Sequence, residues 1–160
     1  MKIKVGFGFD VHQLKDGHPF FMGGVHLEDA KKGAFGHSDA DVLIHAICDA
    51  LLGAANMRDI GYHFPNTDPA YKGISSVKLL EEVRDKIAEK NFTIGNVDCM
   101  ICLEAPKINP HIPKMQEILA VAMQIDADDV SIKATTNETM GFIGREEGVV
   151  AYATCLIEKK

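Results

Sequence analysis

The feature that most constrains this chain is its most apolar stretch, residues 42–55, which is interrupted by only two strongly polar side chains, His45 and Asp49. Leucine, isoleucine and alanine recur along it at the spacing of a helix. Ser38, followed three residues later by Asp41, resembles a capping box and predicts that the helix begins at Ser38. Because a membrane span needs roughly 20 apolar residues, we expect no membrane partner.

Three polar residues, Asp41, His45 and Asp49, fall at positions i, i+4 and i+8 and therefore share one face of this helix. Charged side chains among apolar neighbours need partners. One hypothesis is that Asp41 or Asp49 holds the far nitrogen of a metal-bound His45, as the outer hydrogen-bond partners of metal ligands do. The alternative is a solvated polar stripe.

The rest of the chain alternates between strand and helix patterns. Serine and proline starts predict two further helices, one from Ser75 or Ser76 and one from Pro110 or Pro113. Pro, Gly, Asn and Asp are frequent in residues 59–73, which predicts a long loop of the kind that is often functional. Strands are predicted at residues 2–9, 20–22, 93–103, 130–134 and 148–157.

This order of elements favours one α+β domain spanning residues 1–160. We expect a sandwich of one mixed β-sheet with helices on one face and an oligomer interface covering the other. The chain has 160 residues, of which 46% are hydrophobic, so it can bury a sizeable core. The N-terminus resembles no signal peptide, and we expect a cytoplasmic protein, or a plastid protein if this is a mature form without its transit peptide.

The net charge of -6 gives no electrostatic reason to expect a nucleic-acid partner. A phosphorylated substrate would need local help from metals, backbone N–H groups and a few basic side chains. The cysteines, Cys48, Cys99, Cys102 and Cys155, have apolar neighbours typical of reduced, packed thiols. Cys99 and Cys102 form a C-x-x-C, but on a strand they point to opposite faces, and no second pair completes a zinc site.

The first candidate site combines Asp10-x-His12 with His45. On an extended segment, residues at i and i+2 project to the same side, so Asp10 and His12 can bind one metal ion. His45 completes the group if its helix packs over that strand end. Two imidazoles and one carboxylate leave tetrahedral zinc an open position, which a phosphoryl oxygen can take. The alternative is a surface Asp and a hydrogen-bonded His at a strand end.

Two polar segments suggest phosphate contacts. His37 and Ser38 stand just ahead of the predicted helix, where free backbone N–H groups attract anions. In the segment from Lys133 to Glu138, threonine hydroxyls can bind phosphate oxygens, and Glu138 can hold a magnesium ion together with substrate phosphates. That second segment is equally typical of a turn with a capping Glu.

A glycine-rich segment from Gly141 to Gly148 contains Arg145, whose guanidinium can clamp a phosphate with two hydrogen bonds. The segment is equally consistent with a structural hairpin that contains an Arg–Glu pair.

The order of these motifs resembles the 2-C-methyl-D-erythritol 2,4-cyclodiphosphate synthase family over nearly the whole chain. The matching segments are Gly8-Phe9-Asp10-Val11-His12, His37-Ser38-Asp39-Ala40-Asp41-Val42, Asp49-Ala50-Leu51-Leu52-Gly53-Ala54, Asp59-Ile60-Gly61, Phe64-Pro65-Asn66-Thr67-Asp68-Pro69, Ala105-Pro106-Lys107, residues 133–138 and Gly141-Phe142-Ile143-Gly144-Arg145.

The resemblance implies an enzyme of the non-mevalonate route to isoprenoids. Its substrate would be 4-diphosphocytidyl-2-C-methyl-D-erythritol 2-phosphate, whose 2-phosphate attacks its own β-phosphate, closes a cyclic diphosphate and expels CMP. The resemblance also implies a homotrimer with active sites between neighbouring subunits. The alternatives are a zinc phosphohydrolase that uses the same ligands and a metal-stabilised trimeric binding module without turnover.

Roles for individual residues follow from the resemblance. Zinc would be held by Asp10, His12 and His45, and a magnesium or manganese ion by Glu138 and the substrate diphosphate. His37 and Thr136 would stabilise the transition state. The remaining implied substrate contacts are Ser38, Asp59, Ile60, Gly61, Phe64, Pro65, Asn66, Thr67 and Asp68 for the methylerythritol phosphate, Leu103, Glu104, Ala105, Pro106, Lys107, Ile108, Asn109 and Thr135 for the cytidine, and Asn137, Phe142 and Arg145 nearby.

Overall fold

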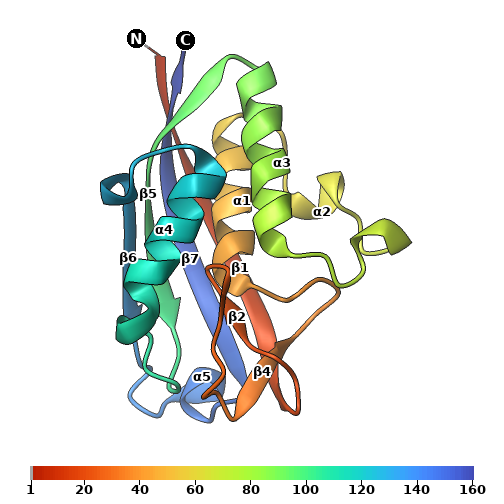
Figure 1. Cartoon of the computed structure of the whole chain (residues 1–160), viewed down its shortest axis with the longest axis vertical. Coiled ribbons are helices and arrows are strands. Elements are labelled where there is room, and N and C mark those ends of the chain that lie inside the picture. Colours follow the sequence, from red (N-terminus) through yellow and green to blue (C-terminus); the bar gives the residue numbers. More distant parts are fainter. Residues whose placement is uncertain (1) are drawn as a thin grey trace.

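The computed structural model describes residues 2–160 and contains one mixed sheet with helices packed on it (Figure 1). The order across the sheet is β4-β1-β7-β5-β6. β5 and β6 run parallel, and the other neighbouring strands are antiparallel. The strands of this sheet are β1 (Lys2–Asp16), β4 (Lys32–Phe35), β5 (Phe92–Cys102), β6 (Val130–Thr135) and β7 (Gly148–Lys159), and a separate hairpin consists of β2 (Phe21–Met22) and β3 (Val25–His26).

The long helices α1, α3 and α4 lie together on one face of the sheet, as the orange, green and teal ribbons of Figure 1 show. The prediction of an α+β fold with one mixed sheet is therefore confirmed. None of the helices within residues 2–160 has both the length and the apolar character needed to cross a membrane. The helices are α1 (Val42–Ala54), α2 (Ile60–His63), α3 (Ser76–Glu89), α4 (Ile112–Met123) and α5 (Gly141–Gly144), with 3₁₀ turns at Pro69–Tyr71, Asn109–His111 and Ala127–Asp129.

Helix α1 is the centre of the core, and it lies unusually close to β1. Nearly all of its apolar side chains are buried. A Cβ atom added at Gly6 would lie 1.9 Å from the carbonyl oxygen of Ala50, and one added at Gly8 would lie 1.9 Å from that of Ala46. The two glycines therefore allow the helix backbone to rest directly on the strand, because any larger side chain would overlap it.

Some predicted boundaries were wrong. α1 begins at Val42 rather than at Ser38, and its N-cap is Asp41, whose carboxylate accepts the N–H of Ile44 at 3.1 Å. Ser38 instead accepts the N–H of Ala40 at 3.2 Å within the preceding turn. The sequence pattern misplaced the start because Ser and Asp are both good N-cap residues, and only tertiary contacts decide between them.

Strand β1 is much longer than predicted, and β4 was not predicted at all. Pairing with β7 and β4 keeps β1 extended through polar residues as far as Asp16. The predicted loop at residues 59–73 contains α2 and a 3₁₀ turn, which have few apolar residues of their own to signal them.

The sheet face opposite the helices is apolar and exposed. Along β1, side chains alternate between the two faces, and those that point away from α1 are exposed by 71% at Val5, 64% at Phe7 and 45% at Phe9. Tyr152 on β7 lies against both phenylalanine rings, with its centroid 6.2 Å from that of Phe7 and 5.3 Å from that of Phe9. A row of large exposed apolar side chains of this kind is typical of an interaction surface.

The contact between β1 and α1 predicts that Gly8→Ala destabilises the protein. The new methyl group must push α1 away from the sheet, which should lower the free energy of unfolding by about 1–3 kcal/mol, as overpacking of a core does. Gly53→Ala is the matched control, because Gly53 lies on the exposed side of the same helix with open space around it. There the substitution should stabilise the helix by up to about 1 kcal/mol. Urea unfolding of both variants measures the difference, and equal stability would contradict the close contact.

Candidate metal centre and substrate cavities

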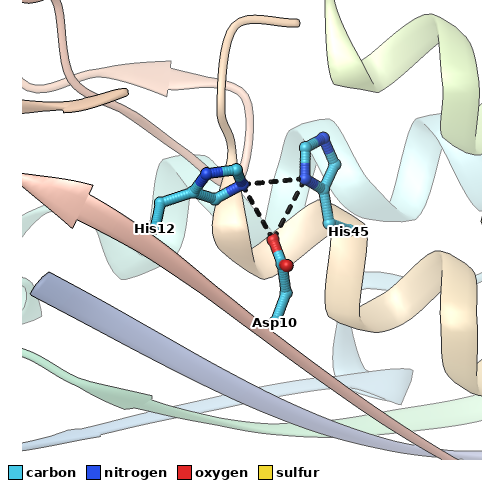
Figure 2. A group of neighbouring side chains, drawn as sticks. All are labelled: Asp10, His12 and His45. Carbon is cyan, nitrogen blue, oxygen red and sulfur yellow. Dashed lines mark hydrogen bonds and ion pairs between the residues drawn. The ribbon is translucent and has the colours of Figure 1, made fainter. Parts of the chain in front are cut away.

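Asp10, His12 and His45 meet where the end of α1 nearest its N-terminus crosses β1 (Figure 2). The Nε2 atom of His12 lies 2.9 Å from Oδ2 of Asp10, and Nδ1 of His45 lies 3.1 Å from the same oxygen. The two imidazole nitrogens are 3.2 Å apart. All three side chains are partly buried.

This group fits a tetrahedral metal ion. Zinc bonds of about 2.1 Å place neighbouring ligand atoms about 3.4 Å apart, close to the separations of these three atoms. The donor set of two imidazoles and one carboxylate suits zinc, and the three residues leave one coordination position open. It is the only group of three or more His, Cys, Asp or Glu side chains with such geometry in residues 2–160.

The outer nitrogens of both imidazoles have hydrogen-bond partners. Nδ1 of His12 lies 3.1 Å from the carbonyl oxygen of Phe35 on β4, so it can donate there while Nε2 faces the group. Nε2 of His45 lies 2.9 Å from Oγ of Ser76 and 3.1 Å from Oγ of Ser38. Neither serine was predicted to contact His45.

The hypothesis that Asp41 or Asp49 holds the far nitrogen of His45 was therefore wrong. Asp41 is fully buried, and its carboxylate accepts the N–H groups of Gly23 at 2.9 Å and Gly24 at 2.7 Å in addition to its capping bond. Asp49 accepts the N–H of Ile60 at 2.7 Å. Both acids bind backbone amides, and the outer side of the imidazole is occupied by the two hydroxyl groups.

Asp10 and His12 shift each other's pKa. Burial alone would raise the pKa of Asp10, but its polar and charge interactions with His12 and His45 outweigh it and lower the pKa from 3.8 to about 2. For His12, burial favours the neutral imidazole, yet the neighbouring Asp10 carboxylate dominates and raises the pKa above 6.5. Asp10 thus remains a carboxylate across the physiological range, as a metal ligand must.

The metal group lies in the wall of a cavity of about 260 Å³. The imidazole of His37 also lines it, and Nε2 of His37 is buried with no hydrogen-bond partner among residues 2–160. An unpaired buried nitrogen is costly, so this atom is suited to a ligand in the cavity. The lining residues are Asp10, His12, Gly36, His37, Ser38, His45, Ile60, Gly61, Phe64, Asn66, Tyr71, Ile74 and Leu79.

A second cavity, of about 210 Å³, lies between the segment after β5 and the end of β6. The carboxylate of Glu104 accepts the N–H of Asn137 at 2.7 Å, which fixes the turn after β6 against this segment. Glu138 and Thr139, the next residues of that turn, both have positive φ angles. The lining residues are Leu103, Glu104, Pro106, Lys107, Ile108, Asn109, Ala134, Thr135 and Thr136.

The other residues singled out in the sequence line neither of these two cavities. Asp59 and Asp68 are the N-cap residues of α2 and of the following 3₁₀ turn. Arg145 forms a two-pronged ion pair with Glu147, with both N–O distances 3.0 Å, as the structural alternative expected. The hairpin expected with it was wrong, because Gly141–Gly144 form the helix α5. The remainder are Pro65, Thr67, Ala105, Asn137, Glu138 and Phe142.

The sequence analysis missed several residues of the first cavity, namely Gly36, Tyr71, Ile74 and Leu79. Tyr71 lies within the predicted loop and Ile74 directly after it, and their only signal was that this loop is long and contains few apolar residues. Leu79 was hidden among the other core positions of α3. The two cavities share no lining residue, so in one chain the metal group and the second cavity are separate.

Comparison with known proteins agrees with this geometry. The YgbB family model matches residues 3–158. A 2-C-methyl-D-erythritol 2,4-cyclodiphosphate synthase from Cytophaga hutchinsonii is 64% identical over 159 residues, which is 99% of this chain and 99% of the relative.

Two solved structures are similar along the whole of this chain. The bifunctional IspDF from Campylobacter jejuni matches with a TM-score of 0.95 and 36% identity over 99% of this chain and 43% of that longer chain. The CDP complex of IspF from Plasmodium falciparum matches with a TM-score of 0.86 and 31% identity over 99% of this chain and 97% of the other. The sequence match, the shared fold and the two-histidine, one-aspartate group lead to one conclusion: the chain belongs to the YgbB family.

Proposed function

We propose that this protein converts 4-diphosphocytidyl-2-C-methyl-D-erythritol 2-phosphate to 2-C-methyl-D-erythritol 2,4-cyclodiphosphate and releases CMP. The observation that supports this most directly is the Asp10, His12 and His45 group in the wall of a cavity that is also lined by His37, whose buried Nε2 has no hydrogen-bond partner among residues 2–160. The close relatives carry this enzyme's name. The phosphohydrolase alternative has no support among these relatives.

Asp10, His12 and His45 would hold zinc, which when bound acts as a Lewis acid on a phosphoryl oxygen. The chain's own residues align the reacting groups. His37 can donate its free Nε2 hydrogen to a phosphate in the first cavity, where Ser38 adds a hydroxyl group. No side chain needs to act as a nucleophile, because the attacking oxygen belongs to the substrate and phosphoryl transfer depends mainly on alignment and charge neutralisation.

The first cavity is suited to the methylerythritol phosphate. Ile60 and Gly61 lie at its wall, and the Asp49 carboxylate holds the start of α2 there through the N–H of Ile60. The proposed contacts of Asp59, Pro65, Thr67 and Asp68 come from the same loop.

We assign the cytidine to the second cavity. The similar structure from Plasmodium falciparum is a CDP complex, which supports a cytidine nucleotide as a ligand of this family. Leu103 and Ile108 offer apolar surface, while Lys107 and Thr135 offer polar groups. Thr136 is proposed to stabilise the transition state, and Glu138, which is exposed close by, to bind magnesium or manganese together with the diphosphate. Ala105, Asn137, Phe142 and Arg145 remain proposed neighbours of the nucleotide.

The separation of the two cavities supports a site shared between subunits. One substrate must reach both the metal group and a cytidine pocket, yet in one chain these are lined by different residues. The exposed apolar face of β1 and β7 gives a surface on which copies of the chain can assemble. We propose a homotrimer whose active sites combine the first cavity of one copy with the second cavity of its neighbour.

The whole chain is proposed to form one catalytic domain, because a single core extends from β1 to β7. A cytoplasmic location is likewise proposed, in keeping with the bacterial relatives.

The assignment predicts a specific product. Incubated with the cytidyl-diphosphate substrate, zinc and magnesium, the protein should release CMP and the cyclic diphosphate in equal amounts, as measured by chromatography. His12→Ala removes one metal ligand and should reduce turnover more than about 100-fold, beyond the loss typical of outer hydrogen-bond partners. His26→Ala is the matched control, because His26 is exposed on β3 and lines neither cavity.

Other outcomes of this assay would contradict the assignment. Inorganic phosphate in place of CMP would indicate a phosphohydrolase, and binding without any product would indicate a binding module. Full turnover by His12→Ala without bound metal would rule out the metal centre.

Zinc affinity should depend on pH in one direction. His12 must lose its proton to bind the metal, and its pKa is raised above 6.5 by Asp10. Below that pKa, protons compete with zinc for His12, so affinity should fall as the pH is lowered and approach a loss of about tenfold per pH unit for this residue. Asp10, with a pKa of about 2, stays ionised throughout and adds nothing to this slope. Chelator competition between pH 8 and pH 5.5 measures the effect, and constant affinity would contradict the proposed role of His12.

The protein should contain three chains per particle in light scattering. Phe7→Asp should dissociate the particle and abolish turnover, because it places a charge in the exposed apolar face. Val121→Asp is the matched control, since Val121 is an apolar residue of α4 that is 76% exposed on the helical side. That variant should remain trimeric and active, and a monomeric, active wild-type protein would overturn the shared-site model.

A further inference from the structure

We propose that Asp39 and Ser76 are positioning residues that hold the imidazole of His45 in the tautomer with its free lone pair on Nδ1, directed at the metal centre. The inference rests on the metal site proposed above and adds residues to which no role has been given. The tautomer is determined by which atoms of Asp39, Ser76 and His45 can donate a hydrogen bond and which can only accept one.

The first step is the contact between Ser76 and Asp39. Ser76 is fully buried at the start of α3. Its hydroxyl group donates a hydrogen bond to Oδ1 of Asp39, and its backbone N–H donates to Oδ2 of the same carboxylate at 2.9 Å. A carboxylate only accepts hydrogen bonds, so the hydroxyl hydrogen of Ser76 belongs to this contact.

The second step is the contact between Ser76 and His45. Oγ of Ser76 lies 2.9 Å from Nε2 of His45. Because the single hydroxyl hydrogen is already donated to Asp39, the serine oxygen can only accept here, and Nε2 must supply the hydrogen. In a neutral imidazole the lone pair is then on Nδ1.

The third step is the direction of that lone pair. Nδ1 of His45 is the atom that lies 3.1 Å from Oδ2 of Asp10 and 3.2 Å from Nε2 of His12 (Figure 2). With hydrogen on Nε2, all three inward atoms are acceptors, as one metal ion requires. The other tautomer would direct an N–H at the metal position and prevent coordination.

A second hydroxyl group supports this arrangement without fixing it. Oγ of Ser38 lies 3.1 Å from the same Nε2 and accepts the N–H of Ala40 at 3.2 Å. A hydroxyl group can both donate and accept, so Ser38 alone is compatible with either tautomer. Ser76 selects the tautomer with hydrogen on Nε2, because the hydroxyl hydrogen of Ser76 is directed at Asp39.

The three residues come from different parts of the fold. Asp39 lies in the turn before α1, His45 on α1, and Ser76 at the first turn of α3. Asp39 also accepts the N–H of Asp41 at 3.3 Å, which ties it to the N-cap of α1. The orientation of the His45 imidazole therefore depends on how α3, which carries Ser76, packs against α1.

The metal affinity of the complete protein tests the proposal. Ser76→Ala and Asp39→Asn should each weaken zinc binding about 10–100-fold in chelator competition, the usual loss when an outer partner of a metal ligand is removed. Ser75→Ala is the matched control, because Ser75 is the exposed N-cap of the same helix and its side chain makes no capping hydrogen bond. Ser76→Thr, which keeps the hydroxyl group, should bind more tightly than Ser76→Ala. Circular dichroism of the metal-free proteins verifies that each variant is folded.

The tautomer itself is measured in the metal-free protein by two-bond ¹H–¹⁵N correlation spectra of labelled histidine, with His45→Asn identifying the signals. Wild type and Ser75→Ala should show hydrogen on Nε2, and Ser76→Ala should show a larger fraction on Nδ1. Hydrogen on Nδ1 in the wild type would overturn the proposal, as would wild-type zinc affinity in folded Ser76→Ala and Asp39→Asn. If the wild type binds no zinc, the metal site fails together with the inference; if it binds zinc and the variants bind equally well, only the inference fails.

Discussion

The direct contact of helix α1 with strand β1 determines most of what this structure can do. It requires Gly6 and Gly8 on the inner face of the strand, where no side chain separates the two backbones. Asp10 and His12 continue the same face, because side chains alternate along a strand. The close approach therefore brings both residues within reach of His45 on the helix. A one-residue slip of β1 against β7 would turn this face outward and bury the apolar row in its place.

Three polar residues on one face of α1 have three separate structural roles. Asp41 caps the helix and binds the turn of the β2–β3 hairpin through the N–H groups of Gly23 and Gly24. His45 belongs to the metal group, and Asp49 holds α2 at the wall of the first cavity. Burial raises the pKa of Asp49, so its hydrogen bond to a backbone amide is what compensates for the loss of solvent. A single helix face thereby organises the surroundings of the first cavity.

The sequence predicted the parts of this arrangement that depend on local periodicity. The strand spacing of Asp10 and His12 and the helical spacing of His45 were sufficient to propose one metal group, and the fold brings the three residues together. Opposite faces were expected for Cys99 and Cys102, and the first is buried while the second is only partly so. The start of α1, the strand β4 and the partners of His45 were not predicted correctly, because each depends on contacts between segments distant in the sequence. Ser76, in particular, appeared in the sequence only as a candidate helix cap.

The division of the substrate cavities also explains why the outer face of the sheet can remain apolar. A chain with a net charge of -6 must bind a highly anionic substrate, and a single cavity offers it few basic side chains. In the proposed trimer, the metal group and the nucleotide pocket of one site would come from different copies, and each copy would supply only part of the charge compensation. The same assembly would remove Val5, Phe7 and Phe9 from water, so the stability of the particle and the completeness of the site would depend on one interface. An isolated chain would then lack both the cover for its sheet and half of its substrate contacts, which makes assembly a condition for turnover.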